Sequence, residues 1–237
     1  MKKLLILSLF FLQEISSQKV EKDYPLSKKI EETSGLEIID DLFVTHNDSG
    51  GQASLYYLSK EGKIIKTREI ESAVNKDWED LTRDEEYIYI SDMGNNFNNR
   101  KDLKIYKVPI DESSEEKTKI ISFNYPEQDS FKINRNTIYD AEGLISIDDK
   151  LLIFTKNRAN KITELYLIPK VPGNYDAKKI GTLKVNSIIT GADYNKDLKL
   201  LALTSTIDFN EYYLITINDF SLEWKKNHKI NMFKIPI

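Results

Sequence analysis

The sequence has no cysteine, only two histidines and, among 237 residues, only nine glycines and six prolines. The missing thiols exclude disulfide bonds, a cysteine nucleophile, zinc fingers and iron–sulfur clusters. The low glycine and proline content argues against a fibrous or low-complexity chain. Lys and Arg number 34 against 38 Asp and Glu and form no dense patch, so no nucleic-acid partner is expected.

The first 17 residues are typical of a secretory signal peptide. Met1-Lys2-Lys3 is positively charged, residues 4–12 are apolar, and the small residues Ser16 and Ser17 follow. This apolar run is too short to span a bilayer, and no later stretch is long and apolar enough to anchor the chain. We therefore predict a signal peptide at 1–17, a single domain at 18–237, and an exported periplasmic or extracellular protein without a membrane anchor. The alternative is a buried core strand at residues 4–12.

A repeated pattern runs through the remaining chain. Four β-rich segments end in a hydroxyl-bearing and a polar residue, and each is followed by a second β-rich segment with a central aromatic residue. The first segments are 42–46, 89–92, 153–156 and 202–205; the second are 55–58, 105–108, 165–168 and 212–215. A short motif, acidic or rich in small residues, precedes each pair. The central tyrosines Tyr56, Tyr106, Tyr166 and Tyr213 are separated by 50, 60 and 47 positions.

A period near 40–50 residues, with several short strands per unit, is typical of a β-propeller. Fourth strands are expected at 63–70, 118–123, 179–185 and 222–230. We predict an all-β propeller of four-stranded antiparallel blades, with repeats at 33–70, 77–124, 139–185 and 189–230. Segments 19–32 and 220–237 either help to close the ring or leave it incomplete. A β-sandwich with similar hairpins is the alternative fold.

The motifs also carry a family resemblance. They are Ser34-Gly35-Leu36, residues 46–50 (HNDSG), 77–81 (DWEDL), 92–96 (DMGNN) with Arg100, 140–144 (DAEGL) and 189–194 (ITGADY). With these motifs the chain resembles a family of secreted bacterial proteins in the six-bladed, TolB-like propeller superfamily. It is more distantly similar to gluconolactonase-like and esterase-like phytase propellers. The resemblance implies a six-bladed ring, and the family normally continues with a further Glu-Gly-containing blade that this sequence does not contain.

The polar residues of these motifs are expected to meet at one end of the ring. In an antiparallel meander, the start of the inner strand and the end of the second strand lie at the same end of a blade. Glu79, Glu142 and Asp193 lie near the starts of the expected inner strands. They should therefore share a face with the polar residues that end the second strands, which are His46, Asn47, Asp48, Asp92, Asn95, Lys156 and Arg158.

Carboxylate and amide oxygens converging in this way could bind a hard cation, and calcium is the cofactor we expect. The predicted metal ligands are Glu79, Asp92, Asn95 and Glu142, and the predicted ligand-binding residues are His46, Asn47, Asp48, Trp78, Lys156, Arg158 and Asp193. Two alternatives are open. Residues 47–51 and 92–96 could simply form turns, and Glu79 and Glu142 could hydrogen-bond to the backbone of neighbouring blades.

No complete catalytic arrangement is visible. There is no Gly-x-Ser-x-Gly motif, and Ser49 lies too close in sequence to His46 to suggest a triad. We therefore predict a monomeric module that binds a small-molecule or protein ligand, and we do not favour an enzyme. The alternative is a metal-dependent hydrolase of the lactonase or phosphoesterase type, with Glu79 and Glu142 as the catalytic candidates and Lys156, Arg158 and Arg100 orienting an anionic substrate.

Overall fold

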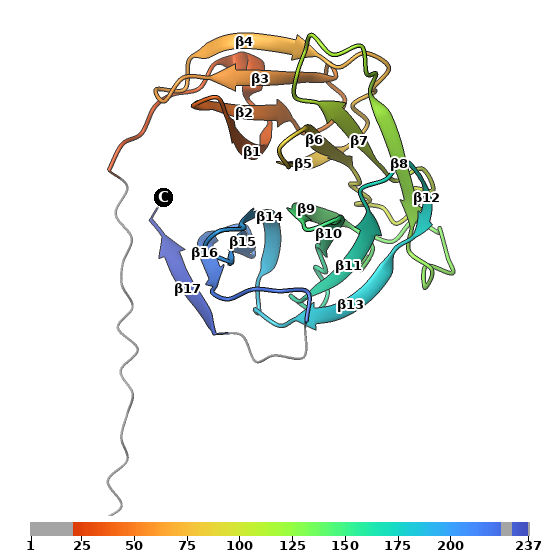
Figure 1. Cartoon of the computed structure of the whole chain (residues 1–237). Coiled ribbons are helices and arrows are strands. Elements are labelled where there is room, and N and C mark those ends of the chain that lie inside the picture. Colours follow the sequence, from red (N-terminus) through yellow and green to blue (C-terminus); the bar gives the residue numbers. More distant parts are fainter. Residues whose placement is uncertain (1–20, 224–228, 237) are drawn as a thin grey trace, which may run out of the picture.

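The chain forms four antiparallel sheets arranged as blades around a common axis (Figure 1). A computed structural model describes residues 21–223 and 229–236, which contain the strands β1–β17 and one short 3-10 helix, η1 (Lys28–Ile30). The predicted all-β propeller is confirmed, and the sandwich alternative is wrong, because the sheets are arranged radially rather than as two stacked layers.

Each blade is a four-stranded meander. Blade 1 contains β1 (Thr33–Ile39), β2 (Leu42–Asn47), β3 (Ser54–Leu58) and β4 (Ile64–Glu69). Blade 2 contains β5 (Trp78–Arg83), β6 (Tyr87–Asp92), β7 (Lys104–Pro109) and β8 (Lys119–Asn124). Blade 3 contains β9 (Ala141–Ile147), β10 (Lys150–Thr155), β11 (Thr163–Pro169) and β13 (Lys178–Leu183). Blade 4 contains β14 (Ile188–Asn195), β15 (Leu200–Ile207), β16 (Glu211–Ile217) and β17 (Ile230–Ile235).

Apolar side chains fill the spaces between consecutive blades. Val44 and Leu55 of blade 1 pack with Trp78 and Ile90 of blade 2, and all four are fully buried. Equivalent clusters join blade 2 to blade 3 and blade 3 to blade 4. Central strands are buried on both faces, which explains their nearly continuous apolar sequences. Burial of these side chains between the blades therefore holds the inner strands β1, β5, β9 and β14 around the axis.

Between blades 4 and 1 the ring is open (Figure 1). A cavity of about 630 Å³ lies there, lined by Leu36 and Phe43 on one side and by Ala192 and Leu203 on the other. The helix η1 places Ile30 against Tyr56 and Leu58 of blade 1, while β17 pairs with β16. Among the described residues, the two terminal segments therefore do not combine into a closing blade.

The outer strand of blade 4 differs from its predicted range of 222–230. The strand β17 begins at Ile230, where the predicted strand ends, and residues 224–228 lie outside the described part. Phe220 is buried in the cluster between blades 3 and 4, so the chain packs into the core there before it reaches the outer edge of the blade. The outer strand can only begin after this crossing.

An additional strand joins the second and third blades. β12 (Gly173–Asp176) leaves the β11–β13 connection and pairs in parallel with β8, so it covers the outer edge of blade 2.

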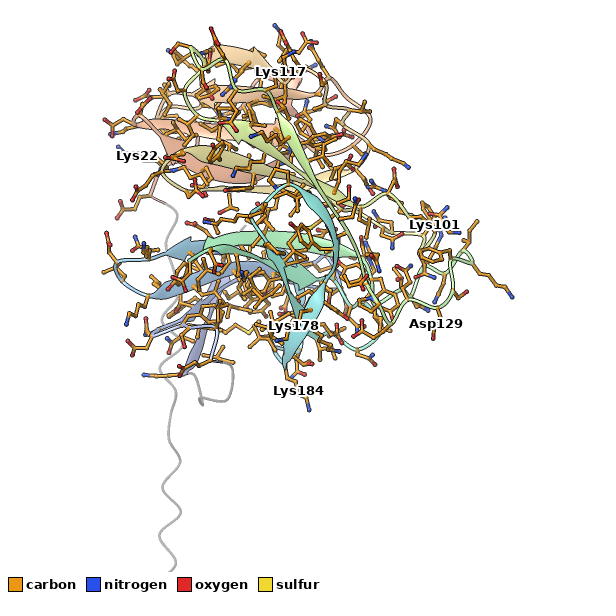
Figure 2. The ribbon with its side chains drawn as sticks, turned by 45° about the vertical axis from the view of Figure 1, so that its right-hand side comes forward. Lys22, Lys101, Lys117, Asp129, Lys178 and Lys184 are labelled. Carbon is orange, nitrogen blue, oxygen red and sulfur yellow. The ribbon has the colours of Figure 1, made fainter. Side chains whose placement is uncertain are left out.

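The loops that carry Lys101 and Asp129 project away from the ring (Figure 2). Asn98 holds these loops together by donating its side-chain amide to the carbonyl oxygens of Ser130 and Lys132. Within the described residues, no helix has the length and apolar character needed to cross a membrane.

Candidate functional site

Two acidic residues occupy equivalent irregularities in neighbouring inner strands. The pairing of β5 with β6 passes from Trp78 directly to Asp80, which leaves Glu79 as an extra residue. The pairing of β9 with β10 passes from Ala141 to Gly143 and leaves out Glu142 in the same way. Such a β-bulge interrupts the regular alternation of side chains and redirects one of them. The bulges therefore place Glu79 and Glu142 at the same level near one end of the ring.

Asp48, Asp77 and Glu79 form a compact carboxylate cluster at this end. Asp48 follows β2, and its carbonyl oxygen accepts a hydrogen bond of 3.0 Å from the Trp78 N–H at the start of β5. One carboxylate oxygen from each of the three acids lies within 4.8 Å of the other two. Oxygens bound to one Ca²⁺ at 2.3–2.6 Å can be at most about 5 Å apart, so the three acids can reach a single ion.

Gly94 makes the close approach of two of these carboxylates possible. A Cβ atom at position 94 would overlap both Oε1 of Glu79 and Oδ2 of Asp77. Gly94 lies in the turn after β6, and its N–H donates to the carbonyl oxygen of Asp77 at 3.2 Å. The glycine is therefore required by space, and it fixes the turn against the backbone that carries the cluster.

The acids next to the cluster form ion pairs with basic residues, whereas the three acids of the cluster do not. Three ion pairs surround the cluster: Arg100 with Asp92 at 2.8 Å, Arg158 with Asp140 at 2.7 Å, and Lys156 with Glu142. No base lies within 4.0 Å of the carboxylates of Asp48, Asp77 or Glu79 among residues 21–223 and 229–236. Glu79 is only 4% exposed, and within the same ranges its carboxylate has no hydrogen-bond donor. A buried carboxylate without a partner is energetically unfavourable unless a cation or a proton compensates it.

The pKa values of all three acids are raised. Burial raises the pKa of Glu79 well above its ordinary value, and the charges of Asp140, Asp48 and Asp77 add to this effect. Burial and the charge of Asp77 raise the pKa of Asp48 to about 6. The pKa of Asp77 is also raised by burial, although Arg100 opposes the shift. Mutual repulsion within the cluster therefore favours the binding of positive charge.

Only Glu79 of the four predicted metal ligands lies in this cluster. The carboxylate of Asp92 is fully buried, and its Oδ1 accepts hydrogen bonds from Arg100 and from the N–H of Asp77. The side chain of Asn95 donates to the carbonyl oxygen of Tyr139 at 3.1 Å and accepts from the N–H of Arg100 at 3.0 Å. Glu142 is paired with Lys156. Asp92 ends β6 and its Oδ2 has no partner among the described residues, whereas Asn95 lies in the turn that follows β6, where its carbonyl oxygen accepts from the N–H of Asn98 at 2.9 Å.

Three of the predicted ligand-binding residues belong to the interior or to a local backbone contact. His46 and Trp78 are fully buried and pack edge to face, with ring centroids 5.5 Å apart. Burial lowers the pKa of His46 to about 4, so its imidazole is neutral at physiological pH. The Asn47 side-chain amide donates to the carbonyl oxygen of Lys29 at 2.8 Å. Lys156 and Arg158 do lie beside the acidic cluster, but as partners of Glu142 and Asp140.

Asp193 does not join the other acids. Glu79 and Glu142 are the second residues of β5 and β9, whereas Asp193 is the sixth residue of β14. It therefore lies further along the axis, where it lines a cavity of about 820 Å³ together with Glu37 and Arg83. The prediction that Asp193 shares the face of Glu79 is corrected, because β14 begins five residues before Asp193. In β14 the bulge residue equivalent to Glu79 is Thr190.

The sequence interpretation missed one acid of the cluster, Asp77, one acid beside the cluster, Asp140, and the role of Asp80 at the axis of the ring. Asp77 and Asp140 stand at the start of the motifs 77–81 and 140–144, directly before the inner strands, and this position was the available signal. Asp80 has a different role. Its carboxylate is fully buried and accepts hydrogen bonds from the N–H groups of Leu81, Leu144 and Ala192, at 2.9, 2.9 and 3.2 Å. It therefore links the inner strands of blades 2, 3 and 4 at the axis.

No protein-family model and no curated protein matches the sequence. Among solved structures, 16 chains match, including a quinonprotein alcohol dehydrogenase-like protein from Bacteroides thetaiotaomicron. The two chains are 12% identical, with a TM-score of 0.42, and the match covers 84% of this chain and 45% of that chain. This chain thus spans less than half the length of that protein. The arrangement of its own strands makes it a β-propeller, with four blades in the described part.

Proposed function

We propose that this protein is a ligand-binding β-propeller module whose cluster of Asp48, Asp77 and Glu79 binds a calcium ion. The observation that carries the proposal is the group of three carboxylate oxygens within 4.8 Å of one another, left over when the adjacent acids are paired with Arg100, Arg158 and Lys156. The bound ion would expose its remaining coordination positions to a partner or small-molecule ligand at this end of the ring.

The chemistry of the donors favours calcium over softer metals. All three candidate ligands are carboxylates, the chain has no cysteine, and the nearby His46 is buried against Trp78. Oxygen-only sites select Mg²⁺, Ca²⁺ or Mn²⁺ rather than Zn²⁺ or Cu²⁺. Ca²⁺ accepts six to eight oxygens in irregular geometry, which suits ligands from two blades, whereas Mg²⁺ requires a nearly ideal octahedron.

Calorimetric titration of the full chain with CaCl₂, after EDTA treatment, tests the proposal. We expect one Ca²⁺ per chain, and a rise in melting temperature of about 5–10 °C at a hundredfold excess over the dissociation constant. Glu79→Gln should abolish both effects. The control is Glu112→Gln, which removes the same charge from an exposed ion pair with Lys66. Absence of heat and of a thermal shift in the wild-type protein would contradict the proposal.

A metal-dependent hydrolase of the lactonase or phosphoesterase type is the second candidate. It is favoured by Glu142 and Lys156, which form a buried acid–base pair beside the carboxylate cluster. In such an enzyme the ion would activate a water molecule, and Glu142 would accept its proton. A panel of esters, lactones and phosphoesters assayed with Ca²⁺, Mg²⁺ and Mn²⁺ distinguishes the two functions. Turnover that Glu142→Gln removes even at Ca²⁺ concentrations that saturate the variant supports the enzyme. A thermal shift without turnover supports the binding module.

The proposal also includes the export of the protein and its relationship to other propellers. We infer that residues 1–17, which lie outside the described residues, direct the protein to the periplasm or the exterior, and that it is related to the six-bladed, TolB-like propellers. Calcium sites of extracellular modules bind with dissociation constants of about 10⁻⁴–10⁻³ M, and we expect this range for an exported protein. Amino-terminal sequencing of the protein recovered from the periplasm or medium tests the export step, with Gln18 as the expected first residue.

A further inference from the structure

Lys156 is a buried cation at the same end of the ring as the carboxylate cluster, and both its backbone and its side chain are bonded to blade 3. It directly follows β10, at the end of the ring where Glu79 and Glu142 lie, and it is 7% exposed. Its N–H donates to the carbonyl oxygen of Asp140 at 2.7 Å, and its ammonium group pairs with Oε1 of Glu142. The position of this positive charge is therefore fixed by the fold rather than by a flexible surface chain.

The charge of Lys156 acts on the cluster as well as on Glu142. Burial lowers the pKa of Lys156, whereas the negative charges of Asp140, Glu79 and Asp48 oppose that shift. In the same way, the charge of Lys156 lowers the pKa values of Glu79 and Asp48 against the effect of burial. Lys156 is therefore electrostatically coupled to two of the three cluster acids, although it forms its ion pair with a fourth.

We propose that Lys156 is an internal counter-cation of the cluster, which stabilises the protein without calcium and weakens the binding of calcium. This inference rests on the proposed function. A divalent ion placed between Asp48, Asp77 and Glu79 would experience the repulsion of Lys156 across a buried region, where charges are screened less than in water. Removing the ammonium group of Lys156 should therefore destabilise the calcium-free protein and strengthen the binding of calcium.

The decisive experiment compares Lys156→Met with two controls in the full chain. Methionine keeps the length and the apolar stem of lysine without its charge. Lys156→Arg keeps the charge, and Lys150→Met removes an equal charge from the other end of β10, where Lys150 pairs with the exposed Asp149. The readouts are the Ca²⁺ dissociation constant from calorimetric titration and the melting temperature in EDTA and in CaCl₂.

We expect Lys156→Met to bind Ca²⁺ about tenfold more tightly than the wild-type protein and to melt at a lower temperature in EDTA. Lys156→Arg and Lys150→Met should keep the wild-type affinity. Unchanged or weaker binding by Lys156→Met would overturn the inference, whereas absence of Ca²⁺ binding by the wild-type protein would refute the proposed function instead. If Lys156→Met does not fold even in CaCl₂, Glu142→Gln is measured instead. This variant leaves Lys156 without its ion-pair partner and should weaken Ca²⁺ binding. Equal or tighter binding by Glu142→Gln would overturn the inference.

Discussion

Replacement of Glu37 by Gln should make the protein more stable at neutral pH. Glu37 lies in β1, its side chain is 14% exposed, and its Oε1 accepts a hydrogen bond of 3.1 Å from the N–H of Arg83. Burial, and then the charge of Asp193, raise the pKa of Glu37 from 4.5 to about 7, although Arg83 opposes them. Glutamine has the same shape and can still accept from the Arg83 N–H, but it carries no charge to be buried.

The sign and size of the effect follow from proton linkage. Between pH 4.5 and 7 the folded protein keeps a proton on Glu37 that the unfolded chain has released, so the free energy of unfolding falls as the pH rises. At 1.36 kcal/mol per pH unit, a pKa raised from 4.5 to about 7 lowers the free energy of unfolding by about 3 kcal/mol. This loss of stability reaches its full size above pH 7. It is absent below pH 4.5, where the folded and the unfolded protein both hold the proton.

Urea unfolding of the wild-type protein and of Glu37→Gln, measured from pH 4 to pH 8, provides the assay. The two proteins should have equal stability at pH 4, and the variant should be about 3 kcal/mol more stable at pH 8. Asp193→Asn serves as a companion variant, because it removes the neighbouring charge and should shift the midpoint of the wild-type pH dependence downward. A stability difference that does not change with pH would refute the assignment of a raised pKa to Glu37.

Two further predictions concern the axis and the cation site. Asp80→Ala leaves the buried N–H groups of Leu81 and Leu144 and the partly buried N–H of Ala192 without an acceptor, and should lower the free energy of unfolding by about 3 kcal/mol in urea titrations. Asp80→Asn, which keeps one oxygen, should cost less. Gly94→Ala should force the Glu79 and Asp77 carboxylates apart and weaken Ca²⁺ binding by tenfold or more in calorimetry, and unchanged affinity would argue against the carboxylate cluster as the site.

The blades could be predicted from the sequence because burial leaves a local signature. Ile88 and Ile90 of β6, like Leu151 and Ile153 of β10, are fully buried, and apolar pairs of this kind recur at each second strand. A central strand buried on both faces needs such residues wherever it occurs, so the spacing of the apolar runs reports the spacing of the blades. The outer strand of blade 4 lacked this signature, since β17 is only half-buried on one face.

The site was harder to predict because its geometry depends on distant partners. Asp92 and Asn95 look like ion ligands in sequence, but in the fold Arg100 pairs with Oδ1 of Asp92, and Arg100 and Tyr139 hold both ends of the Asn95 side-chain amide. Asp193 was misplaced for another reason. We expected Asp193 to occupy the position of Glu79 because both are acidic residues of the repeated motifs. In the structure the equivalent positions of the inner strands are the bulge residues, and in β14 that residue is Thr190. A bulge is a pairing irregularity, and nothing in a single sequence marks it.

One strand connects the proposed cation site to the integrity of the ring. In β5, Glu79 reaches the carboxylate cluster, the next residue Asp80 accepts N–H groups from blades 3 and 4, and the carbonyl oxygen of Glu79 accepts the Ser34 hydroxyl of blade 1 at 2.6 Å. An ion that fixes Glu79 therefore restrains the segment at which all four inner strands meet. Because binding to the folded state alone raises its stability, calcium should protect the whole ring against unfolding and not only the loops that carry Asp48 and Asp77.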